Sequence, residues 1–314
     1  MNNLKKKVTL LAGGVGGAKI AEGLDAIKSV ELSVIGNIAD DENFHGLWVS
    51  PDIDTITYSL AKIINRKQGW GLSNDKYNTL SILKKLGLET WMSLGDKDFG
   101  VHIYRSFRLK KGDKRSKIAE ALSKAFNLKT KIILPTDDII QTRVLTNTGW
   151  LSFQEYFVKQ SCLPKVKKIF FKGIKKAKPT LKAIKSIQNA DIIIFAPSNP
   201  LVSLRPIIEI PGIKKAIIMS TAKKIGISPF IGNKTVKGPA SKMMIELGFN
   251  PNALGFSEQF HNVLDALIID YKDELLIENI KKNVKNVYLS NILMLDMKNK
   301  IRLAKEVMKF SNYF

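Results

Sequence analysis

The chain has 314 residues, of which 45% are hydrophobic, so it can bury the core of two domains or of one large α/β unit. It carries 50 basic and 28 acidic residues, and the net charge of +22 makes nucleic acid a partner to consider. Only seven basic residues are Arg, however, and the Lys residues are spread from Lys5 to Lys309. In their densest group, 165–178, they alternate with apolar residues as on a strand with one solvated face. We therefore expect no nucleic-acid partner, and salt-sensitive DNA binding is the alternative.

Cys162 is the only cysteine, which excludes a disulfide framework and a thiolate metal cage and fits a reducing compartment. No apolar stretch of the sequence is long enough to cross a bilayer. The basic residues 1–7 lead into an apolar run that breaks at Gly13 and offers no small-residue cleavage site, so we expect no signal peptide. We predict a cytoplasmic protein without a membrane partner.

The first half of the chain has α/β patterning. Leucine-rich and β-branched runs predict strands at 8–12 and 31–35, and the amphipathic helix between them completes a right-handed βαβ unit. Apolar residues spaced by three and four predict helices at 53–64, 76–86 and 114–126. Further strands are predicted at 131–134, 142–146 and 153–158, the last two as antiparallel partners in a smaller subdomain.

The second half continues this alternation. The continuous apolar run 191–196 is typical of a central parallel strand that is covered on both faces. A turn-rich loop at 228–242 is either a long connection or a ligand loop. The other expected elements are helices at 180–188 and 243–247, a core strand at 216–220, a charged helix from Tyr271, a strand at 287–293 and a basic helix at 298–310.

These patterns predict an α/β fold, with a Rossmann-like parallel sheet flanked by helices and a smaller inserted α+β subdomain. We assign residues 1–64 and 165–314 to the Rossmann-like core and residues 65–164 to the insert.

A glycine-rich turn, Gly13-Gly-Val-Gly-Gly-Ala-Lys19, follows the first predicted strand. Without Cβ atoms the backbone can approach a phosphate closely, and the N–H groups at the start of a helix point toward it. The spacing fits neither the dinucleotide fingerprint nor the P-loop, so a plain tight connection remains the alternative. Pro197-Ser-Asn-Pro200 ends the central strand, and we expect both turns to face one crevice at the carboxyl ends of the strands.

Acidic residues are the minority in this basic chain, and they occur in pairs. Carboxylates beside a phosphate loop are what Mg²⁺ needs, since it takes one or two carboxylates together with phosphate oxygens. Helix capping is the competing explanation for Asp52 and Asp54. The three histidines show no zinc-site spacing, and Trp70 and Trp91 either stack on a flat ring or belong to the core. The four acidic pairs are Asp40 and Asp41, Asp52 and Asp54, Asp96 and Asp98, and Asp137 and Asp138.

Ten motifs between residues 8 and 265 occur in an order that resembles the 2-phospho-L-lactate transferase family of coenzyme F420 biosynthesis. Their joint occurrence is far more specific than any one of them. The motifs are Gly13–Lys19, Asn37–Asp41, His45–Leu47, Ser50–Thr55, Gly69–Gly71, Leu94–Asp98 with His102, Asp137–Asp138, Phe153–Phe157, Pro197–Pro200 and Gly238–Lys242.

The resemblance implies transfer of a phospholactyl or enolpyruvyl phosphate group to the deazaflavin alcohol Fo. The donor would be lactyl-2-diphospho-5′-guanosine or its enolpyruvyl counterpart, and GMP would leave. The resemblance also implies Mg²⁺ on Asp40, Asp41 and Asp54 with Asp52 in support. The identity of a general base stays open: either Asp41 or Asp54 takes the Fo proton, or the metal makes a dedicated base unnecessary.

The substrate-binding residues follow from the same resemblance. Fo would lie at Asp54 and Lys97, with Trp70 and His102 beside it, so that the insert contributes to the acceptor site. Family members usually carry Arg in place of Lys97, Gly in place of Ala39 and Thr in place of Val15, so this chain lacks the bidentate fork and one hydroxyl. The nucleotide would rest on Gly14, Gly16, Gly17, Ser198, Asn199, Gly238 and Lys242.

The main alternative is a nucleotide-sugar-binding regulatory protein of the same fold without transferase activity. That related family usually lacks the Ser50–Thr55 and Gly69–Gly71 motifs, which counts against it. The sequence leaves open whether the donor carries lactate or enolpyruvate. A homodimer is the default expectation for the oligomeric state.

Overall fold

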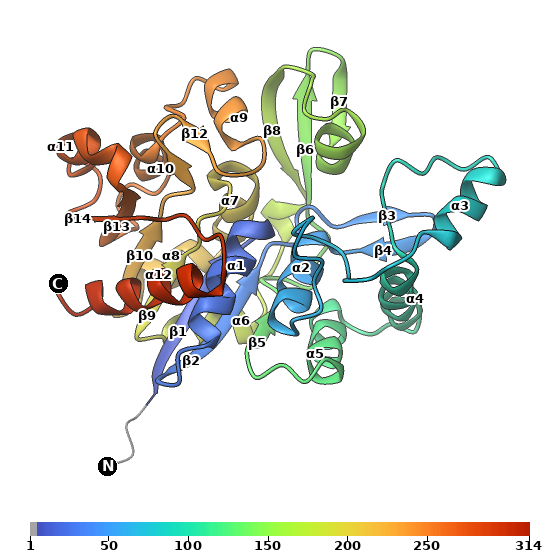
Figure 1. Ribbon diagram of the computed structural model, residues 1–314, viewed down its shortest axis with the longest axis horizontal. Coiled ribbons are helices and arrows are strands. Elements are labelled where there is room, and N and C mark those ends of the chain that lie inside the picture. The colour runs from blue at the N-terminus through green and yellow to red at the C-terminus, as the bar shows by residue number, and fades with distance from the viewer. Residues whose placement is uncertain (1–4) are drawn as a thin grey trace.

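The computed structural model describes residues 5–314, so the first four residues of the basic N-terminal stretch lie outside it. A seven-stranded sheet forms the centre of the fold, with the order β14-β13-β10-β9-β1-β2-β5, and every pair of neighbours is parallel (Figure 1). The strands are β1 (Lys6–Ala12), β2 (Val30–Gly36), β5 (Lys131–Ile133), β9 (Ile192–Phe195), β10 (Lys223–Ile227), β13 (Ala266–Asp270) and β14 (Asn286–Ser290).

The order of the strands reverses at β1, because β2 lies on one side of it and β9 on the other. All side chains of β9, and those of β1 from Val8 onward, are buried, as expected for strands covered on both faces. Adjacent loops diverge at such a reversal and leave a crevice at the carboxyl ends of the strands. The glycine turn follows β1 and the Ser-Asn turn follows β9, so both begin at this crevice.

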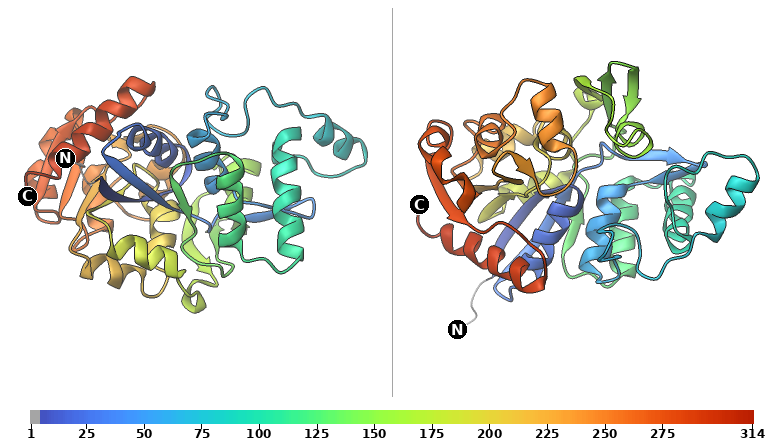
Figure 2. Two further views of the ribbon diagram at one scale, coloured as in Figure 1. Left: turned by 90° about the horizontal axis from the view of Figure 1, so that it is seen from below. Right: turned by 45° about the horizontal axis from the view of Figure 1, so that its top comes forward.

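Helices cover both faces of the sheet (Figure 2). On one face α1 (Gly14–Asp25) lies between α2 (Pro51–Leu60) and α12 (Met297–Phe310), and the opposite face carries α6 (Leu181–Gln188) and α8 (Ile213–Met219). The Rossmann-like class is therefore confirmed. The remaining helices on the C-terminal side are α7 (Arg205–Ile208), α9 (Ala240–Glu246), α10 (Ala253–Gln259) and α11 (Ile277–Ile280).

The smaller parts of the fold surround this core. A hairpin of β3 (Glu42–Phe44) and β4 (Leu47–Val49) lies beside α4 (Asp96–Lys110), and α3 (Asn78–Lys85) lies at the far end (Figure 1). A separate antiparallel sheet contains β7 (Gly149–Ser152), β6 (Gln141–Thr146) and β8 (Val166–Lys172). The remaining elements are α5 (Arg115–Ala125) and the hairpin of β11 (Phe230–Ile231) and β12 (Lys234–Thr235).

The division of the chain at residues 64 and 165 stays a prediction, and two strands cross it. β5 falls inside the range 65–164 but pairs with β2 in the main sheet. β8 falls in the range given to the core but pairs with β6 in the small sheet.

Two predicted strands are wrong. Residues 153–158 do not pair with β6; β7 does, and a π-helical turn, Glu155–Lys159, follows it. Phe153 and Phe157 stack with their ring centroids 5.6 Å apart, which is the contact of positions one helical turn apart. Residues 216–220 lie mostly in α8, where Ile213 and Ile217 are fully buried, and the neighbouring core strand is β10.

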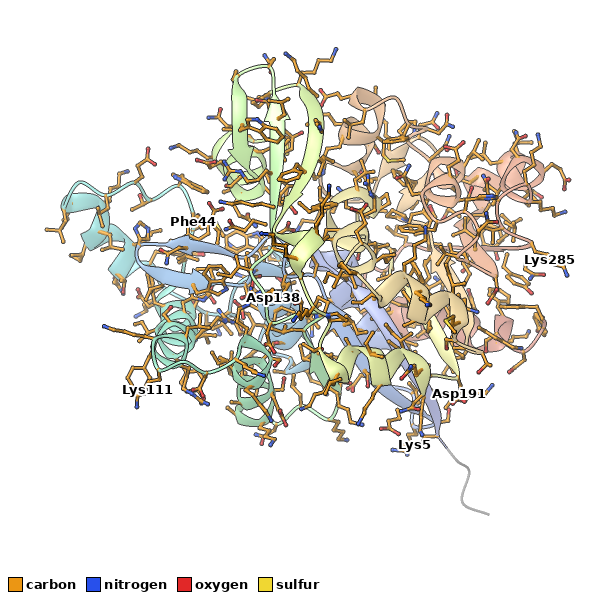
Figure 3. All side chains as sticks on the ribbon, turned by 180° about the vertical axis from the view of Figure 1, so that it is seen from behind. Lys5, Phe44, Lys111, Asp138, Asp191 and Lys285 are labelled. Atoms are coloured by element: carbon orange, nitrogen blue, oxygen red, sulfur yellow. The ribbon has the colours of Figure 1, made fainter. Side chains whose placement is uncertain are left out.

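Nine Lys residues line one open hollow beside β5 and α6, and other Lys residues lie elsewhere on the surface. Lys5, Lys111 and Lys285 lie at three distant corners of the molecule, each exposed (Figure 3). Within residues 5–314 no helix is both long and apolar enough to span a bilayer.

Glu22 of α1 is a buried carboxylate that holds two distant parts of the chain. It forms ion pairs with Lys300 of α12 and, at 2.5 Å, with Arg66 in the loop after α2. The backbones of α1 and α12 approach closely here, since a Cβ on Gly23 would lie 2.3 Å from the Lys300 carbonyl oxygen. The C-terminal helix and the 65–72 loop are thereby attached to the same helix.

Candidate active site

A cavity of about 310 Å³ opens at the carboxyl ends of β1, β2 and β9. The glycine turn, the acids after β2 and at the start of α2, and the turn after β9 form one side of it. Residues of α4, the loop around Trp70 and the aromatic residues after β7 form the other side. The cavity brings together nine of the predicted site residues: Gly14, Gly16, Asp40, Asp54, Trp70, His102, Ser198, Asn199 and Gly238.

The glycine turn packs directly against the turn after β9. Gly13 donates its N–H to the Ser198 hydroxyl at 3.3 Å, and this hydroxyl donates to the Gly13 carbonyl at 2.7 Å. Asn199 caps the next helical turn by accepting from the Leu201 N–H at 3.0 Å. The crevice expected between the two turns is therefore present, and Ser198 and Asn199 hold its shape.

The glycines are required by these close approaches. Gly14 has φ of +59°, a conformation that side chains disfavour. A Cβ on Gly16 would lie 2.0 Å from the Pro197 carbonyl oxygen, and a Cβ on Gly17 would lie 2.7 Å from the Ala12 Cβ. Gly17 supports the turn from beneath and does not line the cavity.

Asp40 and Asp52 face each other at the cavity wall, with Asn37 between them. The Asn37 amide donates to Asp40 Oδ2 at 3.0 Å and to Asp52 Oδ2 at 2.9 Å. Both carboxylates are buried, and Asp40 Oδ1 has no hydrogen-bond partner. Two acids in such a position carry charge that these contacts do not fully compensate.

The pKa values of both acids reflect this environment. Burial, and after it the charge of Asp52, raises the pKa of Asp40 well above its usual range. Burial raises the pKa of Asp52 to about 6, against hydrogen bonds from Asn37 and from the Gly14 backbone. A cation between the two acids would stabilise their ionised forms.

Asp41 points away from the cavity, unlike its neighbour Asp40. It accepts hydrogen bonds from Ser50 Oγ at 2.8 Å and Trp48 Nε1 at 3.2 Å, and Arg115 Nη1 lies 3.5 Å from it. Burial raises the pKa of Asp41 to about 7 although Arg115 opposes this. The structure therefore does not bring Asp41 together with Asp40 and Asp54, and across residues 5–314 no three His, Cys, Asp or Glu side chains form a ready metal cluster.

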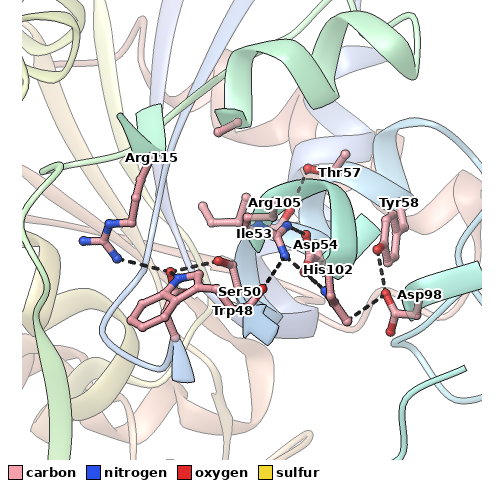
Figure 4. A network of polar contacts seen from close by, with 12 residues as sticks. Trp48, Ser50, Ile53, Asp54, Thr57, Tyr58, Asp98, His102, Arg105 and Arg115 are labelled. Carbon is pink, nitrogen blue, oxygen red and sulfur yellow. Dashed lines mark hydrogen bonds and ion pairs between the residues drawn. The ribbon is translucent and has the colours of Figure 1, made fainter. Parts of the chain in front are cut away.

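Asp54 is held by a buried ion pair with Arg105 of α4 (Figure 4). Arg105 Nη1 also donates to His102 Nδ1 at 3.1 Å, so that nitrogen must carry a lone pair and the ring proton lies on Nε2. The second oxygen of Asp54, Oδ2, has no hydrogen-bond partner and lies 3.8 Å from His102 Nδ1. Asp54 is on the cavity lining, and this buried oxygen is the polar atom of the residue that no described group of the protein binds.

The same network continues to Asp98 and Tyr58. His102 Nε2 lies 3.4 Å from Asp98 Oδ1, and Tyr58 donates its hydroxyl to that oxygen at 2.6 Å (Figure 4). Burial acts to raise the pKa of Asp98, but hydrogen bonds from His102 and Tyr58 outweigh it, so that the pKa is lowered. A chain of polar groups thus fixes the orientation of Asp54 from behind.

The side of the cavity opposite the glycine turn is aromatic and apolar. Trp70, Met92, Phe153 and Phe157 line it, and the two Phe rings are nearly parallel, with 8° between their planes. Such faces suit a flat ring. Trp91 does not line the cavity; it is partly buried and packs edge-on against Phe44 of a small apolar cluster, with ring centroids 5.3 Å apart.

Three other predicted residues lie outside the cavity lining. Lys97 is exposed, and its ammonium donates to the Ser73 carbonyl at 3.0 Å. Lys242 pairs with Glu246 at 2.6 Å and donates to the Pro164 carbonyl. His45, which begins one of the ten motifs, lies in the turn of the β3–β4 hairpin with φ of 53°.

The sequence interpretation misses Asn37 as a bridge, the role of Tyr58, and Arg105 with the whole of α4. A signal for α4 exists in the spacing of Asp98, His102 and Arg105, which are four and three residues apart and therefore share one helix face. The glycine and two acids at the start of this helix are typical of a loop, and they hide the pattern.

The chain is similar to known proteins over nearly its whole length. The family profile described as "2-phospho-L-lactate transferase CofD" matches residues 8–308. The chain therefore belongs to the 2-phospho-L-lactate transferase family. Members of this family are transferases of coenzyme F420 biosynthesis, as the ordered motifs predict.

Individual relatives cover nearly the whole chain. A protein named 2-phospho-L-lactate transferase from Methanocaldococcus jannaschii is 34% identical, over 96% of this chain and 97% of its own length. A protein named phosphoenolpyruvate transferase from Streptomyces griseus is 32% identical, over 97% of this chain and 98% of its own. The crystal structure of a UPF0052 family protein from Bacillus halodurans has the same fold, with a TM-score of 0.66 at 16% identity over 97% of this chain and all of that one.

Proposed function

We propose that the protein transfers a 2-phospholactyl or enolpyruvyl phosphate group from a guanosine diphosphate-linked donor to Fo. A terminal hydroxyl of Fo attacks the phosphorus that carries the acid, the bond from this phosphorus to the departing GMP breaks, and a phosphodiester remains. A relative named 2-phospho-L-lactate transferase is 34% identical to this chain, and one named phosphoenolpyruvate transferase is 32% identical. Overall similarity therefore does not decide between the two donors.

The observation that supports this function is that one cavity contains three different surfaces. The glycine turn after β1 offers backbone N–H groups to a diphosphate. The aromatic residues Trp70, Phe153 and Phe157 offer faces to a tricyclic ring. Asp54 lies on the same lining with one free carboxylate oxygen, which can accept the hydroxyl proton of the acceptor. Transfer between two such substrates depends mainly on positioning and charge neutralisation.

We further propose Mg²⁺ as the cofactor, held by Asp40 and Asp52. The pair fits this ion because both acids are buried, share one amide partner and leave Asp40 Oδ1 unpartnered. Mg²⁺ needs only one or two carboxylates when phosphate oxygens complete its shell. When bound, it would neutralise the charge that develops on the leaving GMP. The expected homodimer and cytoplasmic location stay predictions.

The test is to incubate the purified protein with Fo, Mg²⁺ and each guanylylated donor and to measure GMP release by chromatography. We expect release with one donor and none without Fo. Binding of guanosine nucleotide with no release from either donor would support the regulatory alternative.

Asp54→Asn should abolish GMP release, because the amide cannot take the Fo proton. Asp113→Asn is the matched control, since Asp113 forms a half-exposed pair with Arg108 away from the cavity. Full activity of Asp54→Asn would reject the role of this carboxylate.

A further inference from the structure

The charges around the cavity are unlike those of the whole chain. Four carboxylates, those of Asp40, Asp52, Asp54 and Asp98, line it. Among the described residues that line it, Lys237 is the only Lys or Arg, although the protein carries a net charge of +22. A diphosphate that enters this cavity therefore meets a single cationic side chain.

Lys237 lies at the mouth of the cavity, between the β11–β12 hairpin and Gly238. Its ammonium donates to the Gln68 carbonyl at 2.6 Å, a contact between segments 169 positions apart. A Cβ on Gly69 would lie 3.0 Å from this ammonium and 3.3 Å from Val15 of the glycine turn. The three segments that meet at this point are thus the glycine turn, the loop that carries Trp70, and the loop that enters α9.

The Lys237 ammonium has no acidic partner within residues 5–314, since no ion pair of the structure includes it. Burial lowers the pKa of Lys237. It also lowers the pKa of Lys19 on α1, and the neighbouring charges of Lys300 and Lys237 lower it further, against Glu22. A bound anion would offset the repulsion between the Lys19 and Lys237 charges.

We propose that the Lys237 ammonium leaves the Gln68 carbonyl and binds the diphosphate of the guanosine-linked donor. This inference rests on the proposed function, and it names the side chain that recognises the donor. Lys242, five positions later, is a poorer candidate because Glu246 and the Pro164 carbonyl already occupy its ammonium. A phosphate oxygen carries a negative charge that the Gln68 carbonyl lacks, so exchanging the carbonyl for a phosphate adds Coulomb attraction to the hydrogen bond of the ammonium.

The test measures the affinity for GDP by isothermal titration calorimetry in the presence of Mg²⁺, with Lys237→Gln and Lys237→Arg. Lys234→Gln is the matched control, because it removes the same charge from an exposed residue of the neighbouring β11–β12 hairpin that, unlike Lys237, does not line the cavity. We expect Lys237→Gln to weaken GDP about tenfold or more, Lys237→Arg to recover most of this loss, and Lys234→Gln to change little. The melting temperature of each variant reports on folding.

The outcomes separate this inference from the function on which it rests. Equal GDP affinity of the wild type and Lys237→Gln overturns the inference and leaves the transferase proposal standing. Equal losses in Lys237→Gln and Lys234→Gln also overturn it, because they would reflect general charge. If the wild-type protein binds no GDP, both the inference and the guanosine donor are rejected.

Discussion

The two sides of the cavity are built in different ways. The sheet side, which comprises Gly14, Gly16, Asp40, Asp52 and Ser198, lies where β1, β2 and β9 end, and close backbone packing fixes it. The helix side, which comprises Trp70, Asp98, His102, Phe153 and Phe157, lies on elements outside the main sheet, and side-chain contacts fix it. The sheet side suits a group common to all donors, a diphosphate. The helix side can change with the shape of the acceptor while the sheet is preserved.

The largest effect should come from breaking the ion pair that holds the helix side to α2. Arg105→Met leaves Asp54 buried without its cation, which should cost about 3–5 kcal/mol of unfolding free energy. Arg108→Met, on the same helix, breaks a more exposed pair with Asp113 and should cost less than about 1 kcal/mol. Urea unfolding measures both, and equal costs would show that side-chain contacts do not fix the helix side.

The same substitution on the two sides should have opposite effects. In Gly16→Ala the new Cβ lies 2.0 Å from the Pro197 carbonyl oxygen, so we expect a loss of about 3 kcal/mol of stability and no GDP binding. Gly100 of α4 has open space where a Cβ would be, and Gly100→Ala should stabilise the protein by about 0.5–1 kcal/mol. Retained GDP affinity in Gly16→Ala would contradict a sheet side fixed by the backbone.

The buried acids should make the metal-free protein less stable as the pH rises. Folding raises the pKa of Asp52 to about 6 and of Asp41 to about 7 from a usual value of 3.8, so the folded protein binds more protons than the unfolded chain between these values. This contribution is complete below pH 4 and is lost as the pH rises through 6 and 7.

Calorimetry without metal should show the melting temperature falling by about 5 °C between pH 5 and pH 8. Mg²⁺ should raise it more at pH 8 than at pH 5, because the acids of the sheet side are then ionised. A Mg²⁺ effect that is the same at both pH values would remove the support for metal binding at Asp40 and Asp52.

The smallest effect should distinguish the substrates of the two sides. Trp70→Ala removes one aromatic face and should raise the KM for Fo about fivefold, with unchanged GDP affinity. Trp150→Ala removes an exposed Trp of β7 that does not line the cavity and should change neither value. Weaker GDP binding in Trp70→Ala would mean that the two sides do not divide the substrates as we propose.

The same contrast explains what the sequence could predict. β9 is a continuous apolar run, β1 is rich in leucine and β-branched residues from Val8 onward, and both end in turn residues, so the strands and the crevice beyond them follow from local pattern. The run at 216–220 is also mostly apolar, but whether it forms a strand or a helix depends on tertiary packing. In the folded chain it is helical, with Ile217 buried and Ile218 and Met219 exposed. β13 is fully buried and is absent from the predicted elements, although its first four residues, 266–269, are all apolar.

The acids of the site were harder to predict than its glycines. Adjacent residues Asp40 and Asp41 are equivalent in the sequence, yet one faces the cavity and the other faces Ser50 and Trp48. The direction of each side chain depends on the loop after β2, which no periodicity describes. The bridge from Asn37 to Asp52 joins positions 15 apart and is visible only in the folded chain.

The ion pairs of Glu22 give the end of the chain a role at the entrance of the cavity. Glu22 binds Lys300, 278 positions away, and also Arg66, which lies in the loop that leads to Trp70 and to the Gln68 carbonyl. A fusion partner or a shortened C-terminus that displaces α12 would therefore disturb the loop that carries Trp70 before it disturbs the central strands. Affinity tags for this protein belong at the other terminus.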